Sequence, residues 1–310
     1  MKQNEIVDLL SECRICPRNC GADRNKNNHG MCGQKAGIKA ARAALHMWEE
    51  PCISGINGSG TIFFAGCSMG CVFCQNRAIS GRSQDLKSAI EVSAEELAEV
   101  FLRLQEKGAH NINLVTPTHF IPQIVRAIEI AKMQRLHIPV VYNTSSYEKT
   151  ESLKLLEGLI DIYLPDLKFM DPVLSQRYAK APDYFMYASS AIEEMVRQVP
   201  AAVFDSDGMM KKGVIVRHMM LPDCFQDSKR TIEYLYEKYR DQIYISIMNQ
   251  YTPMPGLEEY PELNRTVRKK EYDKLIDFAI QLGVENGFIQ EGNTASESFI
   301  PEFNGEGIRE

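Results

Sequence analysis

The sequence predicts an α/β fold: a partial barrel of six strand-helix units behind an irregular, cysteine-rich N-terminal cap. From residue 54 onward, short apolar runs alternate with stretches whose apolar side chains recur at the helical period. Six such units imply a parallel sheet with right-handed crossovers, two units short of a closed eight-unit barrel. With 310 residues, of which 44% are hydrophobic, the chain is long enough to bury a large core.

Each unit starts with a predicted strand and continues into a predicted helix. The strands are expected at residues 61–65, 111–115, 139–144, 161–167, 213–221 and 243–248. The first helix is expected to be capped near Ser93, and polar helices are expected from the fourth strand to about residue 199. Five helices have a recognisable apolar face. In chain order, these faces are Leu97, Val100, Phe101 and Leu104; Ile121, Ile124, Val125, Ile128 and Ala131; Leu153, Leu155 and Leu156; Ile232, Leu235 and Tyr239; and Tyr272, Leu275, Ile276 and Ala279.

The two ends of the chain lack this periodicity. Residues 1–53 are expected to form the cap, residues 54–291 the barrel and residues 292–310 a tail. Between Cys13 and Gly33, proline, glycine and asparagine residues are interspersed with the cysteines, a composition typical of turns. Something other than an apolar core must therefore order this segment. The tail is expected to be a strap across the barrel or partly disordered.

Charge and cysteine usage narrow the class of protein. The chain has 35 Lys and Arg against 41 Asp and Glu, a net charge of −6 that disfavours nucleic-acid partners. The start of the chain shows no apolar signal segment, and no run of about 18 apolar residues predicts a membrane span. We therefore expect a cytoplasmic protein. Eight of its nine cysteines lie in the first 74 residues, and in a reducing compartment such clusters hold metal more often than disulfides.

The first motif follows the first predicted strand. Cys67, Cys71 and Cys74 have the spacing CxxxCxxC, and a loop at this end of a barrel strand is where active sites gather. A [4Fe-4S] cluster normally takes four cysteine ligands, so three thiolates would leave one iron open to an exogenous ligand. The alternatives are a zinc site with a distant fourth ligand, and buried structural thiols.

The CxxxCxxC spacing, with the aromatic Phe73 before its last cysteine, resembles the radical S-adenosylmethionine (SAM) superfamily. This resemblance implies that the open iron binds the amino and carboxylate groups of SAM. It also implies that an electron from the cluster cleaves SAM to methionine and a 5′-deoxyadenosyl radical, which abstracts hydrogen from the substrate. The electron donor implied is a flavodoxin or ferredoxin.

Further segments resemble the pyruvate formate-lyase activating enzymes, in a branch with an N-terminal cysteine segment. They are residues 13–21, 30–33, 49–51, 58–64 and 74–76. The resemblance implies a protein or peptide substrate, for which a glycyl radical enzyme is a candidate. A small molecule or a tRNA remains the alternative substrate, and a non-catalytic metal-binding or electron-transfer protein is the alternative function.

The same resemblance implies which residues contact SAM. Asp166 and Lys168 lie two apart on one strand and so face the same side, where both can meet a zwitterion. Arg217 is expected to bind a carboxylate of SAM or of the substrate. The alternative for all three is an ion pair at the rim of the barrel. The remaining implied contacts are Phe73, Gln75, Asn76, Thr116, Thr118, Asn143 and Thr144, with Thr116 and Thr118 at the position of a Gly-Gly-Glu segment in the activating enzymes.

The second motif lies in the cap, where Cys13, Cys16, Cys20 and Cys32 form an N-terminal quartet. Four thiolates on a segment without a core suit tetrahedral zinc, whose binding free energy could order the chain. They suit an auxiliary iron-sulfur cluster equally well. His29 could replace one thiolate, and unliganded thiols are the remaining alternative. Cys52 and Cys224 stand alone and are expected to be ordinary thiols.

Overall fold

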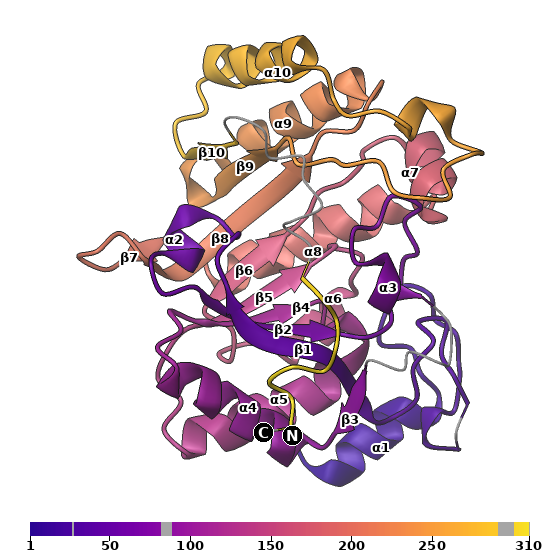
Figure 1. Cartoon of the computed structure of the whole chain (residues 1–310), viewed down its shortest axis with the longest axis vertical. Helices are drawn as coiled ribbons and strands as arrows, with labels where there is room; N and C mark the ends of the chain where they lie inside the picture. The colour runs from indigo at the N-terminus through magenta and orange to yellow at the C-terminus, as the bar shows by residue number, and fades with distance from the viewer. Residues whose placement is uncertain (27, 82–88, 291–300, 310) are drawn as a thin grey trace.

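The computed structural model describes residues 1–26, 28–81, 89–290 and 301–309. Its centre is a curved, open sheet, which confirms the predicted α/β partial barrel (Figure 1). The strands lie in the order β10 (Gly287–Ile289), β9 (Tyr244–Met248), β8 (Met210–Met219), β6 (Ile162–Pro165), β5 (Val140–Thr144), β4 (Ile112–Val115), β2 (Ser59–Phe64), β1 (Ile38–His46) and β3 (Ile90–Val92), and β7 (Val203–Phe204) pairs with β8.

The barrel proper is a parallel sheet running from β2 to β10. All six predicted strands are present, as β2, β4, β5, β6, β8 and β9. They could be predicted because a strand that is buried on both faces of a parallel sheet has a nearly continuous apolar stretch in its sequence. The short β10 adds a further parallel strand beyond β9.

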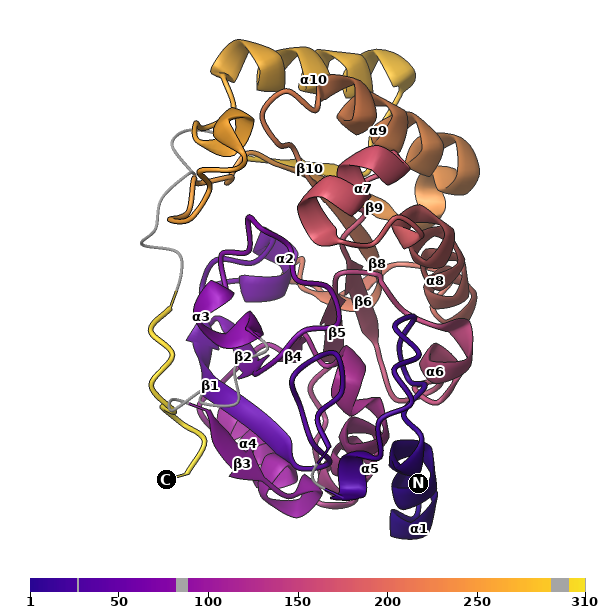
Figure 2. The same cartoon turned by 90° about the vertical axis from the view of Figure 1, so that its right-hand side faces the viewer.

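Helices cover the outer face of the sheet (Figure 2). They are α4 (Ala94–Glu106), α5 (Ile121–Met133), α6 (Thr150–Lys154), α8 (Tyr184–Gln198), α9 (Phe225–Tyr239) and α10 (Lys269–Leu282), with α7 (Pro172–Ala179) before α8. The predicted cap of α4 is present: the Glu96 amide donates to Ser93 Oγ at 3.0 Å, and the Ser93 amide donates to the Glu96 carboxylate at 2.7 Å. Short 3₁₀ turns occur at Arg24–Lys26, Thr118–Phe120, Arg240–Gln242 and Pro261–Leu263.

The N-terminal region is more regular than expected. It begins with helix α1 (Gln3–Ser11), and residues 38–46 form β1, which pairs antiparallel with β2 and with β3. The expectation of an irregular segment as far as about residue 50 is therefore wrong for β1. The irregular part is the cysteine-bearing stretch between α1 and β1, whose described residues form a single short turn, Arg24–Lys26.

Helix α2 (Pro51–Ser54) lies on the inner face of the sheet, opposite the outer helices (Figure 1). Its Cys52 and Ile53 side chains pack with Val141, Ile162 and Ile215 from three barrel strands in a small apolar cluster. The segment before the barrel thus fills part of the barrel interior. It also places the residues just before Pro51 close to the ends of the strands.

The described part of the tail forms a strap along β1. The Gly305 amide donates to the Ala41 carbonyl and the Ala43 amide to the Glu306 carbonyl, both at 2.8 Å, and Ile308 is buried. Residues 292–300 of the predicted tail lie outside the described residues. None of the helices in the described ranges is both long and apolar enough to cross a lipid bilayer.

Candidate active site

The three motif cysteines lie on the CxxxCxxC loop (residues 66–76), which follows β2 and leads into α3 (Arg77–Ser80). Gly66 and Gly70 have left-handed backbone angles, with φ of 85° and 108°, which glycine adopts without strain. The Met69 amide donates to Cys67 Sγ at 3.4 Å. These turns direct all three partly exposed cysteines toward one cavity.

The chemistry of these side chains fits an iron-sulfur cluster. Burial raises the pKa of Cys67 to about 11 and that of Cys71 to about 12. Both are therefore protonated at neutral pH in the absence of metal, and binding a metal must release their protons. Three cysteines on one loop, facing one cavity, match the ligand set of a cluster with one open iron.

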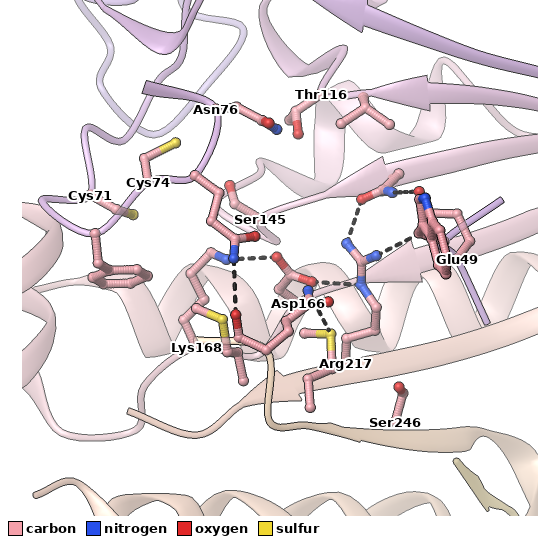
Figure 3. Close-up of a pocket in the computed structure, with 18 of the residues that line it drawn as sticks. Glu49, Cys71, Cys74, Asn76, Thr116, Ser145, Asp166, Lys168, Arg217 and Ser246 are labelled. Atoms are coloured by element: carbon pink, nitrogen blue, oxygen red, sulfur yellow. Dashed lines mark hydrogen bonds and ion pairs between the residues drawn. The ribbon is translucent and has the colours of Figure 1, made fainter. Parts of the chain in front are cut away.

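The cavity measures about 410 Å³ and extends from the cysteines across the carboxyl ends of the strands (Figure 3). This is the edge of a parallel sheet where ligands bind. Most of the cofactor contacts implied by the sequence line it. They are Phe73, Gln75, Asn76, Thr116, Asn143, Asp166, Lys168 and Arg217.

Charged side chains on β8 and after β6 form a connected network in this cavity (Figure 3). Asp166 is its centre: Arg217 Nε donates to Oδ1 at 2.8 Å, and Lys168 Nζ donates to Oδ2 at 2.6 Å. Burial would raise the pKa of Asp166, but Arg217 and Lys168 outweigh it and lower that pKa. Asp166 is therefore ionised, and Lys168 keeps two donors for a ligand.

The network also includes Glu49, a residue that the sequence did not indicate as part of the site. Arg217 Nη1 donates to Glu49 Oε2 at 3.0 Å, and Asn113 donates to Oε1 at 2.9 Å. Arg217 Nη2 donates to Asn143 Oδ1 at 2.6 Å. The Arg217 guanidinium, expected to bind a carboxylate of SAM or substrate, thus already binds two carboxylates of the protein. The ion pair is buried, unlike the rim pair that was the alternative.

The neighbouring Glu50 is the second acidic residue that sequence reasoning missed. It lines the cavity with 8% of its surface exposed, close to Ser246, and its Oε2 has no hydrogen-bond partner among the described residues. Burial is the main cause that raises the pKa of Glu50, and Arg217 only partly opposes it. The one available signal was the segment 49–51 itself, which resembles the activating enzymes but carries no ligand-binding pattern.

Two of the implied SAM contacts lie elsewhere. Thr118 and Thr144 are buried, and each donates to Oε1 of the buried Glu148 at 2.6 Å. The Tyr142 hydroxyl donates to the same oxygen at 3.1 Å. Neither threonine lines the cavity, so the structure joins them to Glu148 and not to the other predicted contacts.

The segment that carries the N-terminal quartet packs against the CxxxCxxC loop. The Cys67 amide donates to the Cys32 carbonyl at 3.3 Å, and Arg18 Nε donates to the Ser68 carbonyl at 2.7 Å. Within the described ranges, no three Cys, His, Asp or Glu side chains are arranged to hold a metal ion. The second metal site therefore remains a prediction.

Comparison with known proteins gives a match over most of the barrel. The sequence pattern of the Radical SAM superfamily matches residues 61–268. An uncharacterized protein of Methanocaldococcus jannaschii is 28% identical over 284 residues, which cover 90% of this chain and 77% of the relative.

Several solved structures align with the chain, and one of them reaches a TM-score that indicates the same fold. The crystal structure of HydG, a maturase of the [FeFe]-hydrogenase, aligns with a TM-score of 0.50 at 16% identity, over 73% of this chain and 50% of HydG. Streptococcus suis SuiB bound to its precursor peptide SuiA gives 0.48 at 12% identity, over 73% of this chain and 46% of SuiB. A domain of the pyruvate-formate lyase-activating enzyme of Bacteroides vulgatus gives 0.40 at 12% identity, over 55% of this chain and 91% of the domain. The chain therefore spans about half the length of HydG and of SuiB.

Proposed function

The chain belongs to the radical SAM superfamily, and from this premise we propose that Cys67, Cys71 and Cys74 bind a [4Fe-4S] cluster and that SAM binds beside it. When bound, the cluster supplies the electron that cleaves SAM, and a flavodoxin or ferredoxin is the proposed donor of that electron. The observation that carries the proposal is the convergence of all three cysteines on one cavity with an ordered set of charges.

In this proposal, the charged network positions SAM. Lys168 keeps two donors beyond its bond to Asp166 and binds the SAM carboxylate. Asp166, ionised and buried, holds Lys168 and Arg217 in place. Thr116, Asn76 and Gln75 supply neutral polar contacts around the rest of the cofactor. Phe73, buried behind the last cysteine, helps to exclude water.

We further propose a protein or peptide as the substrate, as in the activating enzymes that the sequence resembles. Large apolar side chains line the cavity yet remain exposed, with Trp48 59% and Ile289 50% accessible. Exposed apolar surface beside a cavity is typical of a surface that contacts another polypeptide. A glycyl radical enzyme is the first candidate.

Reductive cleavage of SAM tests the enzymatic part of the proposal. The protein, reconstituted anaerobically with iron and sulfide and then reduced, is expected to release 5′-deoxyadenosine from SAM. Cys71→Ala should abolish this release, while Cys52→Ala, which changes a buried cysteine outside the motif, should retain it. Equal turnover by the Cys71→Ala variant would contradict the assignment.

The substrate class needs a separate measurement. A purified glycyl radical enzyme, added to the reduced protein and SAM, is expected to acquire an organic radical detectable by electron paramagnetic resonance. If release of 5′-deoxyadenosine rises only with small molecules or with tRNA, the enzyme is still a radical SAM enzyme but the polypeptide substrate is wrong.

A further inference from the structure

The four cysteines of the N-terminal quartet are neighbours in the structure. Cys13, Cys16 and Cys32 are buried, and Cys20 is partly exposed. A Cβ atom placed on Gly30 would lie 3.2 Å from Cys32 Sγ and 3.6 Å from Cys20 Sγ. Cys20 Sγ donates to the Cys13 carbonyl at 3.8 Å. None of the four forms a disulfide.

Backbone amides point at two of these sulfur atoms. The Arg18 amide donates to Cys16, and the Gln34 amide donates to Cys32, in each case from two residues further along the chain. The Met69 amide makes the same contact with Cys67 in the CxxxCxxC loop. Burial nevertheless dominates and raises the pKa of both Cys16 and Cys32, so a metal that binds their thiolates must displace the protons.

Arg24 gives an independent reason to expect negative charge here. Its side chain is 1% exposed. The guanidinium donates to the Lys35 carbonyl at 2.6 Å and to the His119 carbonyl at 2.7 Å, and its Nη1 lies 3.8 Å from Cys13 Sγ. Its contacts within the part of the chain that the structure describes include no carboxylate. A buried cation without a counter-charge is strongly unfavourable, and the side chain beside it is one of the four quartet cysteines, Cys13.

We propose that Cys13, Cys16, Cys20 and Cys32 bind a second metal centre of net negative charge, with Arg24 as its buried counter-cation. One zinc ion and one [4Fe-4S] cluster both fit four thiolates, and in each case the thiolates outweigh the charge of the metal. Because no three of these side chains are arranged to hold an ion, binding draws this irregular segment closer together.

The centre goes beyond the proposed function because neither SAM binding nor hydrogen abstraction uses these cysteines. It supports the CxxxCxxC loop through the backbone. The Cys32 carbonyl accepts from the Cys67 amide, and Arg18 donates to the Ser68 carbonyl. Gly66 lies so close that an added Cβ would be 2.6 Å from the Cys32 carbonyl oxygen. Ordering of the quartet segment therefore orders the loop next to it.

The test is metal analysis of full-length protein produced with ample iron, sulfide and zinc and purified without oxygen. A variant with Cys67, Cys71 and Cys74 all changed to Ala is expected to retain about one zinc or about four irons per chain. Retained zinc identifies the centre as a zinc site, and retained iron with sulfide identifies it as a cluster. A variant that holds neither metal overturns the proposal. That result leaves SAM cleavage by the natural sequence, and hence the proposed function, unaffected.

Single changes in this triple variant locate the metal. Cys16→Ser is expected to lose it, and Cys52→Ser, at a buried cysteine outside the quartet, is the matched control that retains it. Loss from both variants, or from neither, contradicts the assignment. If the Cys16→Ser protein does not fold, the metal content of the triple variant still decides the question.

The role of Arg24 as counter-cation can be tested separately, through the metal affinity of Arg24 variants. Arg24→Gln removes the charge and is expected to lower the metal affinity by about 10–100-fold, the usual effect of losing a partner of metal ligands. Arg24→Lys keeps the charge and should lose less. Affinity is measured by competition with a chelator. Equal affinities of all three proteins would show that Arg24 is not the counter-cation.

Discussion

The carboxylate of Glu49 and the guanidinium of Arg217 form an ion pair at 3.0 Å across 168 residues of sequence. Both side chains are largely buried. Glu49 precedes the region that matches the superfamily, which begins at residue 61, and Arg217 lies inside it. The charged side chains that line the cavity therefore come from both the N-terminal segment and the barrel.

Burial raises the pKa of Glu49 and Arg217 only partly opposes that shift, but loss of the ion pair with Arg217 should still destabilise the fold. In Glu49→Gln, Arg217 keeps Asp166 but loses one of its two buried carboxylates. We expect the free energy of unfolding to fall by about 1–3 kcal/mol, measured by urea denaturation at pH 7. The control is Glu50→Gln, which removes a buried carboxylate with an unpartnered oxygen. It should change stability by less than about 1 kcal/mol. A larger loss in the control would contradict this account.

Glu148 should make stability depend on pH near neutrality. Burial raises its pKa from 4.5 to about 7, although three hydroxyl groups that donate to it oppose the shift. The protonated form is thus favoured in the folded state. Its stabilising contribution is complete below about pH 4.5 and is lost as pH rises through 7, by about 3 kcal/mol at about 1.4 kcal/mol per pKa unit.

Glu148→Gln removes this titration. Its amide oxygen can still accept the three bonds to Oε1, and its amide nitrogen replaces an oxygen that has no partner among the described residues. The natural protein should lose stability relative to this variant between pH 5 and pH 8, measured by denaturant unfolding at each pH. Parallel stability curves for the two proteins would show that Glu148 does not titrate in this range.

Thr116 and Thr118 should differ in their effect on SAM. Thr116 lines the cavity, and Thr118 donates to Glu148. Thr116→Val is expected to weaken SAM binding by about 3–10-fold, the value of one hydrogen bond, as measured by equilibrium dialysis of cluster-loaded protein. Thr118→Val should leave SAM affinity unchanged and lower the free energy of unfolding by about 1–2 kcal/mol. A weaker SAM affinity in Thr118→Val would favour the role that the sequence resemblance implies.

Gly66 and Gly70 form a matched pair within the CxxxCxxC loop. Both have left-handed φ values, so an alanine at either costs about 1–2 kcal/mol. An alanine at Gly66 also collides with the Cys32 carbonyl, while nothing lies within 4 Å at Gly70. Gly66→Ala should therefore lose much more stability and bind less iron per chain than Gly70→Ala. Similar iron content in the two variants would argue against close packing of the quartet on the loop.

The fold was predictable where burial leaves a local trace in the sequence. Each of the six barrel strands contains a short apolar run, and α4 has a capping box at Ser93, so each could be placed from short patterns. Strand β1 was missed because its sequence, from Ile38 to His46, is rich in alanine and has two basic residues. Alanine favours helices, and pairing with β2 and β3 overrides that preference.

The site was predictable only in part, for a geometric reason. Side chains at the ends of different strands, such as Asp166 and Arg217, meet because parallel strands end at one edge of the sheet. Glu49 and Glu50 reach this edge because α2 enters the barrel interior, and no local pattern predicts that contact. Thr118 does not line the cavity because the turn after β4 directs it to Glu148, and the direction of a turn residue is set by its tertiary neighbours.

The position of α2 inside the barrel also constrains the order of events during synthesis. Glu49 leaves the ribosome 168 residues before Arg217, which at the usual rates of translation is on the order of ten seconds or more. The apolar partners of α2 on β5, β6 and β8 emerge over the same interval. Helix α2 therefore cannot reach its place in the barrel until strands made well after it have emerged, and its apolar side chains remain unburied until then.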